Sequence, residues 1–327
     1  MPEMLLEVKD LQTSFRTREG IIPAVNRVSF EIGRGETLCI VGESGSGKSV
    51  TSLSIIGLLD SPSKVVTGEI KLKGRNLLTL SKNEMRKIRG SEISMIFQEP
   101  MTSLNPVFTI GSQIAESLRT HTGLKRSEAK ARSIELLRIV GIAHPEKAYH
   151  YFPHQLSGGM RQRVMIASAL SCNPSLLIAD EPTTALDVTV QAQILEVIKD
   201  LSNKLNTGVI LITHDLGIVA EMADRVIVMY AGEIVEEARV EDLFDRPLHP
   251  YTSGLLRSLP QLHIEQEELF SIKGTVPNLQ ELPPGCAFQS RCPFATSRCG
   301  TEKPELEWIE AGHRARCFYP LTQGGMR

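Results

Sequence analysis

A glycine-rich motif near the N-terminus constrains the fold of this chain more than any other feature. Residues 42–49 read Gly-Glu-Ser-Gly-Ser-Gly-Lys-Ser and satisfy the pattern G-x-x-x-x-G-K-[ST] at every defined position. The apolar run before the motif predicts a buried parallel strand, and the run after it predicts a helix with one apolar face. In that setting, backbone N–H groups and the positive end of the helix dipole bind phosphate. The motif therefore predicts a nucleoside triphosphate site in an α/β fold, and a plain Gly/Ser-rich surface turn is the weaker alternative.

The side chains of this motif have separate expected roles. Lys48 can reach the β- and γ-phosphates, and the hydroxyl of Ser49 can bind Mg²⁺. The glycines let the backbone fold around the phosphate chain. The residues expected to hold the nucleotide here are Gly42, Ser44, Gly45, Ser46, Gly47, Lys48, Ser49 and Val50.

Composition narrows the class of protein. The chain has 327 residues, which suggests about two domains, and 36 Lys and Arg residues against 38 Asp and Glu residues. This balance, without a long basic run, argues against a nucleic-acid partner. The sequence lacks the apolar run of about 18–20 residues that a membrane span needs, and its N-terminus lacks a signal-peptide pattern. We expect a cytosolic protein, which is still able to dock on a membrane partner.

Polar residues follow three further apolar runs that resemble buried strands. Gln98 follows the first, the pair Asp180–Glu181 the second, and His214 the third. Open α/β sheets bind ligands at the carboxyl ends of their strands, so these side chains are expected at one site. The carboxylate of Asp180 is a candidate Mg²⁺ ligand, and that of Glu181 is a candidate general base for the attacking water. A lone histidine is more often structural, but the matching position of His214 favours a role at the site.

The middle of the chain has helical periodicity from about residue 110 to residue 170, which predicts a helical subdomain at about 100–172 inserted between two strands. Ser157, Gly158 and Gly159 open one of its helices, and alone they are only a capping signal. Ser81 and Glu84 predict a capping box on an earlier helix. Phe15 is a candidate stacking surface for a nucleotide base, with core packing an equal alternative.

Four of the six cysteines lie close to the C-terminus, at Cys286, Cys292, Cys299 and Cys317. Cytosolic disulfides are unusual, so the group is interpreted first as a metal site. The spacing C-x₅-C-x₆-C-x₁₇-C is wide for zinc, although four thiolates suit either zinc or an iron–sulfur cluster. Four nearby arginines either offset the charge of such a centre or are simply solvated: Arg291, Arg298, Arg314 and Arg316.

The motifs between about residues 5 and 240 resemble, in order and spacing, those of the ATP-binding cassette (ABC) ATPases. The matching elements are the phosphate loop 42–49, the Q-loop Gln98, the signature 156–160, the Walker B stretch 176–181, the D-loop 185–187 and the switch residue His214. The signature departs from the usual family pattern at Met160, where glutamine is common.

This resemblance implies a P-loop NTPase cassette over residues 1–245, with a RecA-like α/β core, an antiparallel β-subdomain and the helical subdomain. It implies ATP and Mg²⁺ as ligands, with Ser49, Gln98 and Asp180 near the metal and Phe15 stacking on adenine. In this family the signature of one cassette covers ATP bound to another. Ser157, Gly158, Gly159 and Asp187 would therefore serve a second chain.

Residues 246–327 look like the small irregular C-terminal extension of oligopeptide and dipeptide importer ATPases, and the closest likeness is to the D-type subunit. The resemblance implies a peripheral subunit on the cytoplasmic side of a bacterial membrane. Its implied partners are a related F-type ATPase in a heterodimer, two permeases and an extracytoplasmic binding protein. It also implies a [4Fe–4S] cluster on the four cysteines, with Zn²⁺ or metal-free thiols as the alternatives, and a permease contact at residues 98–106.

Three alternative functions stay open at this point. The branch includes importers of nickel, so nickel or another small solute is a possible cargo. A soluble ABC ATPase of translation or DNA maintenance is disfavoured, because tandem cassettes and a coiled-coil insertion are missing from the sequence. A module that only senses ATP is disfavoured by the presence of Glu181 and His214.

Overall fold

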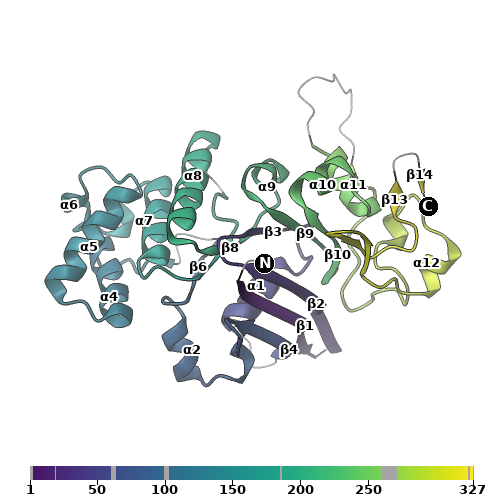
Figure 1. Cartoon of the computed structure of the whole chain (residues 1–327), viewed down its shortest axis with the longest axis horizontal. Coiled ribbons are helices and arrows are strands. Elements are labelled where there is room, and N and C mark those ends of the chain that lie inside the picture. Colours follow the sequence, from purple (N-terminus) through teal and green to yellow (C-terminus); the bar gives the residue numbers. More distant parts are fainter. Residues whose placement is uncertain are drawn as a thin grey trace. The chain divides into compact units, whose positions relative to one another are not determined.

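The computed structural model describes residues 3–18, 20–59, 64–98, 103–184, 186–259, 271–322 and 325–326 (Figure 1). The chain divides into two compact units, each built from several stretches of sequence. Unit 1 consists of Met1–Leu6, Ile32–Thr37 and Leu72–Leu211, and unit 2 consists of Glu7–Glu31, Leu38–Lys71 and Ile212–Arg327.

Unit 1 contains parallel strands that are buried on both faces. Strand β6 (Ile93–Ile96) pairs in parallel with β7 (Leu176–Asp180), and β8 (Gly208–Ile212), of which all but the last residue is in this unit, is the other neighbour of β7. Every residue of β7 and β8 is buried. This burial explains the unbroken apolar runs in the sequence, because strands covered on both faces do not alternate.

The described chain between β6 and β7 is helical, as the periodicity predicts. Its elements are α4 (Ile110–Thr122), α5 (Arg126–Ile139), α6 (Pro145–Ala148), η2 (Pro153–Gln155) and α7 (Gly158–Leu170). Ile110, Ile114 and Leu118 form the buried face of α4. A Cβ at Gly111 would lie 2.1 Å from Cδ2 of Tyr149, so the aromatic ring packs directly on the α4 backbone.

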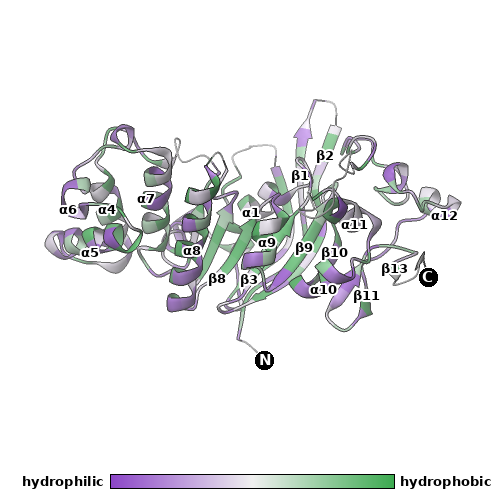
Figure 2. Cartoon of the chain, turned by 90° about the horizontal axis from the view of Figure 1, so that it is seen from above, coloured by the Kyte–Doolittle hydropathy of each residue, from purple (hydrophilic) through white to green (hydrophobic). Residues whose placement is uncertain are grey.

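Unit 2 contains β3 (Thr37–Val41) from Leu38 onward, and β3 pairs in parallel with β9 (Arg225–Tyr230). Both strands are hydrophobic along most of their length, as Figure 2 shows in green. Strand β9 turns back as an antiparallel hairpin into β10 (Glu233–Arg239). The turn uses Ala231 and Gly232, whose φ angles are 48° and 82°.

The rest of the N-terminal part of unit 2 contains one sheet and one helix. Strands β2 (Gly20–Gly33), β1 (Met4–Thr17) and β4 (Lys64–Leu72), most of whose residues are in this unit, are neighbours in that order. Helix α1 (Lys48–Ile56) follows β3 after the loop of residues 42–47. A buried hydrogen bond of 2.8 Å joins the hydroxyls of Thr13 on β1 and Ser54 on α1.

The C-terminal segment adds strands to the edge of unit 2. Strand β12 (His313–Ala315) pairs antiparallel with β10 and with β11 (Glu307–Glu310). The carboxylate of Glu236, fully buried on β10, accepts the backbone N–H groups of Leu248 at 2.6 Å and His249 at 2.9 Å and lies 2.7 Å from Nε2 of His313. One buried acid therefore holds three segments of this region together.

The capping box of Ser81 and Glu84 is confirmed at the start of α2 (Lys82–Ile88). None of the helices in the described part of the chain combines the length and the apolar character that a membrane span requires. The remaining described elements are β5 (Arg75–Asn76), η1 (Leu77–Thr79), α8 (Val188–Leu205), α9 (Leu216–Met222), α10 (Val240–Asp245), α11 (Pro250–Arg257), η3 (Gln289–Arg291), α12 (Ser297–Thr301), β13 (Leu321–Thr322) and β14 (Gly325–Met326).

Candidate nucleotide site

The glycine-rich loop connects β3 to α1 in unit 2, as the sequence predicts, and two of its glycines are required by close packing. Gly42 has φ 147°, and a Cβ there would lie 2.2 Å from the carbonyl oxygen of Met229. Gly47 has φ 99°, and a Cβ there would lie 2.6 Å from the carbonyl oxygen of Ala24. Both positions combine a backbone conformation that favours glycine with a neighbouring main chain that leaves no space for a side chain.

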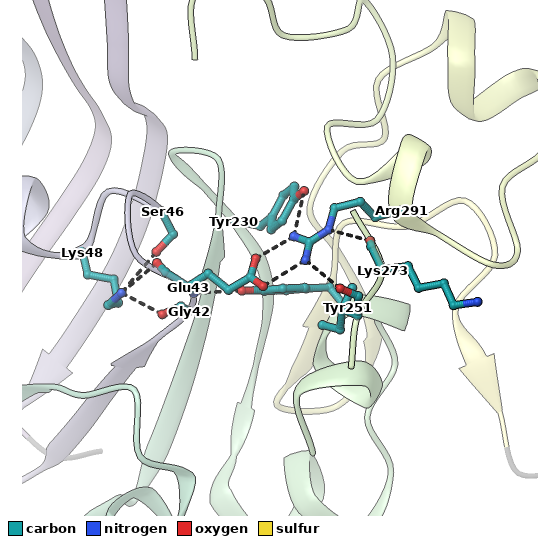
Figure 3. A network of polar contacts seen from close by, with 9 residues as sticks. Gly42, Glu43, Ser46, Lys48, Tyr230, Tyr251, Lys273 and Arg291 are labelled. Carbon is teal, nitrogen blue, oxygen red and sulfur yellow. Dashed lines mark hydrogen bonds and ion pairs between the residues drawn. The ribbon is translucent and has the colours of Figure 1, made fainter. Parts of the chain in front are cut away.

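Lys48 lies over the loop rather than in solvent. Its side chain is buried, and Nζ donates to the carbonyl oxygens of Gly42 at 2.7 Å and Glu43 at 3.0 Å (Figure 3). Ser46 Oγ is 3.5 Å from the same ammonium group. Ser49 and Val50 follow in the first turn of α1, where the helix supplies its free N–H groups and positive dipole end.

The two strand-end residues of unit 1 meet. Gln98 Nε2, beyond the end of β6, donates to Glu181 Oε2, beyond the end of β7, at 3.1 Å. The hydroxyl of Thr184 donates to the same carboxylate oxygen at 2.9 Å. Glu181 has φ 46°, an uncommon left-handed conformation for a residue other than glycine. Such conformations cluster at functional sites, where the surrounding fold maintains them.

Asp180 is the last residue of β7 and is buried, so its carboxylate lies at the end of the strand that carries Glu181. Carboxylate, hydroxyl and amide oxygens are the hard donors that Mg²⁺ prefers, so the donor chemistry of Asp180, Ser49 and Gln98 fits that ion. His214 is exposed after β8, and Phe15 is half-buried on β1. Their contacts with a nucleotide stay predictions.

The signature and D-loop residues of unit 1 occupy helix starts. Ser157 caps α7 by accepting the N–H of Met160 at 3.3 Å, and Asp187 caps α8 by accepting the N–H of Val190 at 3.0 Å. A Cβ at Gly159 would lie 2.8 Å from Val190 Cγ1, so this glycine permits close packing of the two helices. Ala185, the first residue of the expected D-loop, lies outside the described residues.

The four C-terminal cysteines line one cavity of about 20 Å³ in unit 2, together with His249 and Phe288 among others. All four are free thiols. Burial raises the pKa of the Cys317 thiol to about 12, and it also raises the pKa values of Cys286 and Cys292. Burial thus favours the neutral thiols, which must lose their protons before they bind a metal.

The structure does not support the expected metal centre. Within the part of the chain that is described, no three His, Cys, Asp or Glu side chains form a group able to hold a metal ion. The cavity that the four thiols line has room for about one water-sized sphere. The donor chemistry fits zinc or iron, but the arrangement of the thiols does not form a ligand set.

The arginines near these cysteines have other partners. Arg298 pairs with Glu302 at 2.9 Å, Arg314 bonds to Glu237, and Arg316 Nε donates to the carbonyl oxygen of Ile234 at 2.9 Å. The side chains of Arg314 and Arg316 are therefore not simply solvated, whereas the Arg298 side chain is 50% exposed. Arg291 makes the most extensive contacts, and its partner is a residue of the phosphate loop.

Sequence reasoning missed this partnership between Glu43 and Arg291. Both carboxylate oxygens of Glu43 accept from the Arg291 guanidinium, at 2.6 and 3.0 Å (Figure 3). The backbone N–H of Glu43 donates to the Tyr251 hydroxyl at 2.9 Å. The paired residues are 248 positions apart, and the sequence offers only one signal, a carboxylate inside a phosphate-binding motif.

The chain is similar to transporter ATPases over nearly its whole length. Residues 25–184 match the family described as ABC transporter, and residues 235–299 match the oligopeptide/dipeptide transporter C-terminal region. The oligopeptide transport ATP-binding protein AppD of Bacillus subtilis (strain 168) is 58% identical over 321 residues, which cover 98% of each chain. The dipeptide transport ATP-binding protein DppD of Escherichia coli (strain K12) is 49% identical over 321 residues and also covers 98% of each chain.

Solved structures agree on the cassette fold. A dimeric structure of the ATP-binding cassette MJ0796 bound to ADP and Pi has a TM-score of 0.64 and 33% identity, and it covers 72% of this chain and 99% of that chain. The cbiO1 protein from Clostridium perfringens has a TM-score of 0.62 and 26% identity, with coverage of 74% and 91%. The predicted α/β cassette is confirmed, and the metal-binding character of the extension is not. The chain belongs to the ABC transporter ATPases, as an ATP-binding subunit with the C-terminal region of oligopeptide/dipeptide transporters.

Proposed function

We propose that this chain hydrolyses ATP to drive the import of oligopeptides or dipeptides. The observation that carries the proposal is its 58% identity to an oligopeptide transport ATP-binding protein over 98% of both chains, C-terminal region included. The cargo itself is selected by other subunits of such a system. Residues 1–245 form the catalytic cassette in this proposal, with the helical subdomain at about 100–172, and residues 246–327 form the extension.

The proposed roles follow from the chemistry of each side chain. The loop Gly42–Ser49 and Val50 hold the triphosphate, with the Lys48 ammonium at the β- and γ-phosphates. Ser49, Asp180 and Gln98 hold Mg²⁺, which neutralises charge on the phosphates. Phe15 stacks on adenine.

Glu181 polarises the attacking water as a general base, and His214 contacts the γ-phosphate. The bonds from Gln98 and Thr184 to Glu181 support this role, because they fix the carboxylate that must be aimed at water. Removal of the Glu181 negative charge is therefore the direct test.

We expect Glu181→Gln to bind ATP as the unmodified protein does and to lose hydrolysis by about 100-fold or more, since a positioned general base contributes about 10²–10⁴-fold. Phosphate release and nucleotide binding, measured separately, provide the two readouts. Near-normal hydrolysis by this variant would contradict the role of Glu181. Lys48→Ala should instead lose nucleotide binding.

The active assembly in this proposal is a heterodimer with a second ATPase, on two permeases at the cytoplasmic face of the membrane, served by an extracytoplasmic binding protein. Ser157, Gly158, Gly159 and Asp187 would act on ATP held by the second ATPase. Val188, beside Asp187, is 82% exposed, which supports a partner surface there.

The permease contact is proposed at residues 98–106. Val107 and Phe108, which directly follow this segment, are 70% and 54% exposed, which is unusual for large apolar side chains and suits a docking surface. Residues 99–102 of this segment lie outside the described residues. Reconstitution of the full complex in vesicles, with labelled peptide and nickel offered separately, tests the cargo. Nickel uptake without peptide uptake would overturn the peptide proposal.

A [4Fe–4S] cluster on Cys286, Cys292, Cys299 and Cys317 is proposed as a second feature, with Zn²⁺ as its alternative. Its support is that all four thiols line one cavity, although the described side chains are not arranged there as a ligand set. Anaerobic purification followed by iron and zinc assays tests it. About four irons per chain support the cluster, and one zinc per chain without iron contradicts it.

A further inference from the structure

The phosphate loop carries a negative charge of its own. Glu43 is the second residue of the loop, and Lys48 Nζ donates to its carbonyl oxygen at 3.0 Å. A carboxylate at this place opposes a polyphosphate by like-charge repulsion. Neutralisation of this charge therefore favours phosphate binding by the loop.

The C-terminal extension provides the neutralising cation. The Arg291 side chain is only 3% exposed, and its guanidinium meets the Glu43 carboxylate in a two-oxygen contact at 2.6 and 3.0 Å. Two-point arginine–carboxylate contacts are geometrically specific and stronger than single ones. The hydrogen bond to Glu43 raises the pKa of Arg291 above its usual value, so this cation stays charged.

Further contacts fix the position of Arg291. Its Nε donates to the carbonyl oxygen of Lys273 at 3.2 Å, and the hydroxyl of Tyr230 lies 3.4 Å from the guanidinium (Figure 3). Arg291 ends η3, whose preceding residue Phe288 packs against Tyr230 and Tyr251 with ring centroids 5.2 and 5.4 Å apart. The guanidinium is thus held by the extension and by β9, independently of any nucleotide.

The loop backbone is held by the same cluster. The Tyr251 hydroxyl, on α11, accepts the N–H of Glu43, while the Glu43 side chain meets Arg291. Main chain and side chain of one loop residue are therefore both bonded to residues that follow the β9–β10 hairpin. All of these residues belong to unit 2.

We propose that Arg291 is a positioning residue of the nucleotide site, which holds the Glu43 side chain away from bound triphosphate and cancels its charge. The proposal rests on the proposed phosphate-binding role of the loop. It assigns the C-terminal extension a direct part in ATP affinity.

Equilibrium titration of the purified chain with a fluorescent ATP analogue tests this assignment. Arg291→Ala should weaken binding about tenfold, which corresponds to about 1.4 kcal/mol. Glu43→Gln should bind at least as tightly as the unmodified chain, because it removes the repulsion. The double variant Arg291→Ala, Glu43→Gln should bind within about twofold of Glu43→Gln alone, since no charge is left to neutralise.

A matched control is Arg246→Ala. Arg246 pairs with Glu310 at 3.0 Å and with Asp242 at 2.8 Å, so its loss removes an arginine ion pair of the same region without touching the loop. The Arg246→Ala variant should bind the ATP analogue as tightly as the unmodified chain. Thermal unfolding of every variant shows whether the fold persists. If Arg291→Ala alone is unstable, the ATP affinity of the double variant is compared with that of Glu43→Gln, and this comparison tests the proposal.

Two results would overturn the proposal. One is unchanged ATP affinity in Arg291→Ala, and the other is a double variant as weak as Arg291→Ala, which would mean that only packing was lost. Lys48→Ala distinguishes these failures from failure of the loop assignment. If Lys48→Ala keeps full affinity, the phosphate role of the loop is wrong; if it loses binding while Arg291→Ala does not, only the role of Arg291 is wrong.

Discussion

The packing of Gly47 predicts a measurable difference between two glycines of the same loop. Gly45 has φ 79° and Gly47 has φ 99°, so alanine at either position is strained by about 1–2 kcal/mol. A Cβ at Gly45 meets no atom within 4 Å, whereas a Cβ at Gly47 would lie 2.6 Å from Ala24 O and 3.3 Å from the Cα of Gly232. Only Gly47→Ala therefore forces backbone to move.

Overpacking of this kind costs about 1–3 kcal/mol beyond the strain. At an unfolding entropy of about 2.1 cal/mol/K per residue, 1 kcal/mol shifts the unfolding temperature of a 327-residue chain by about 1.5 °C, so Gly47→Ala should unfold at least about 1.5 °C below Gly45→Ala. The comparison is made on nucleotide-free protein by thermal unfolding, so contacts with phosphate do not enter. Equal unfolding temperatures for the two variants would refute the reasoning.

The same change should also disturb the start of α1. The carbonyl oxygen of Gly47 accepts both the N–H and the hydroxyl of Thr51, each at 2.9 Å, so a displaced Gly47 shifts the helix turn that carries Lys48 and Ser49. Nucleotide affinity of Gly47→Ala should fall about tenfold or more. Retention of full affinity would show that the turn tolerates the shift.

Three further predictions concern stability and are checked by thermal unfolding. Glu236→Ala leaves three buried donors without their shared acceptor and should cost at least about 3 kcal/mol; a change of less than about 1 kcal/mol would contradict this account. Gln162→Met removes the donor to the buried carbonyl of Pro182 and should lower the free energy of unfolding by about 1–2 kcal/mol. We expect the low end of this range, because Gln162 Oε1 is itself unpaired among the described atoms. A gain in stability would show that removal of this unpaired oxygen outweighs the lost hydrogen bond. Ser81→Ala removes the capping box with Glu84 and should cost about 1 kcal/mol, and a larger loss would mean that the serine has a role beyond the cap.

Unit 2 contains both the phosphate loop and the C-terminal extension, which explains how the extension can affect the loop. Arg291 and Tyr251 follow the cassette motifs in the chain, yet they bond to Glu43 inside the first motif. The family match to the C-terminal region covers residues 235–299 and thus both of these residues. Loss of the extension would remove the partners of Glu43, and with them the neutralisation of its charge.

The local elements and the chemistry of their ends could be predicted from the amino-acid sequence alone. Buried runs such as residues 176–180 predicted strands, and the glycine-rich motif predicted the strand–loop–helix around Lys48. The meeting of Gln98 and Glu181 was also expected, because neighbouring parallel strands place their carboxyl ends at one edge. These predictions use periodicity and short-range geometry, which a single sequence contains.

The contacts between distant segments depend on the packing of the folded chain. The pairing of Glu43 with Arg291, the left-handed backbone of Glu181 and the size of the cysteine cavity have no signature in spacing, because each depends on how separate segments pack in three dimensions. The cysteine spacing suggested a metal site, but only the folded chain showed that the thiols line a small cavity without forming a ligand set. The sequence identifies the functional side chains, and tertiary packing determines which of them lie close enough to act together.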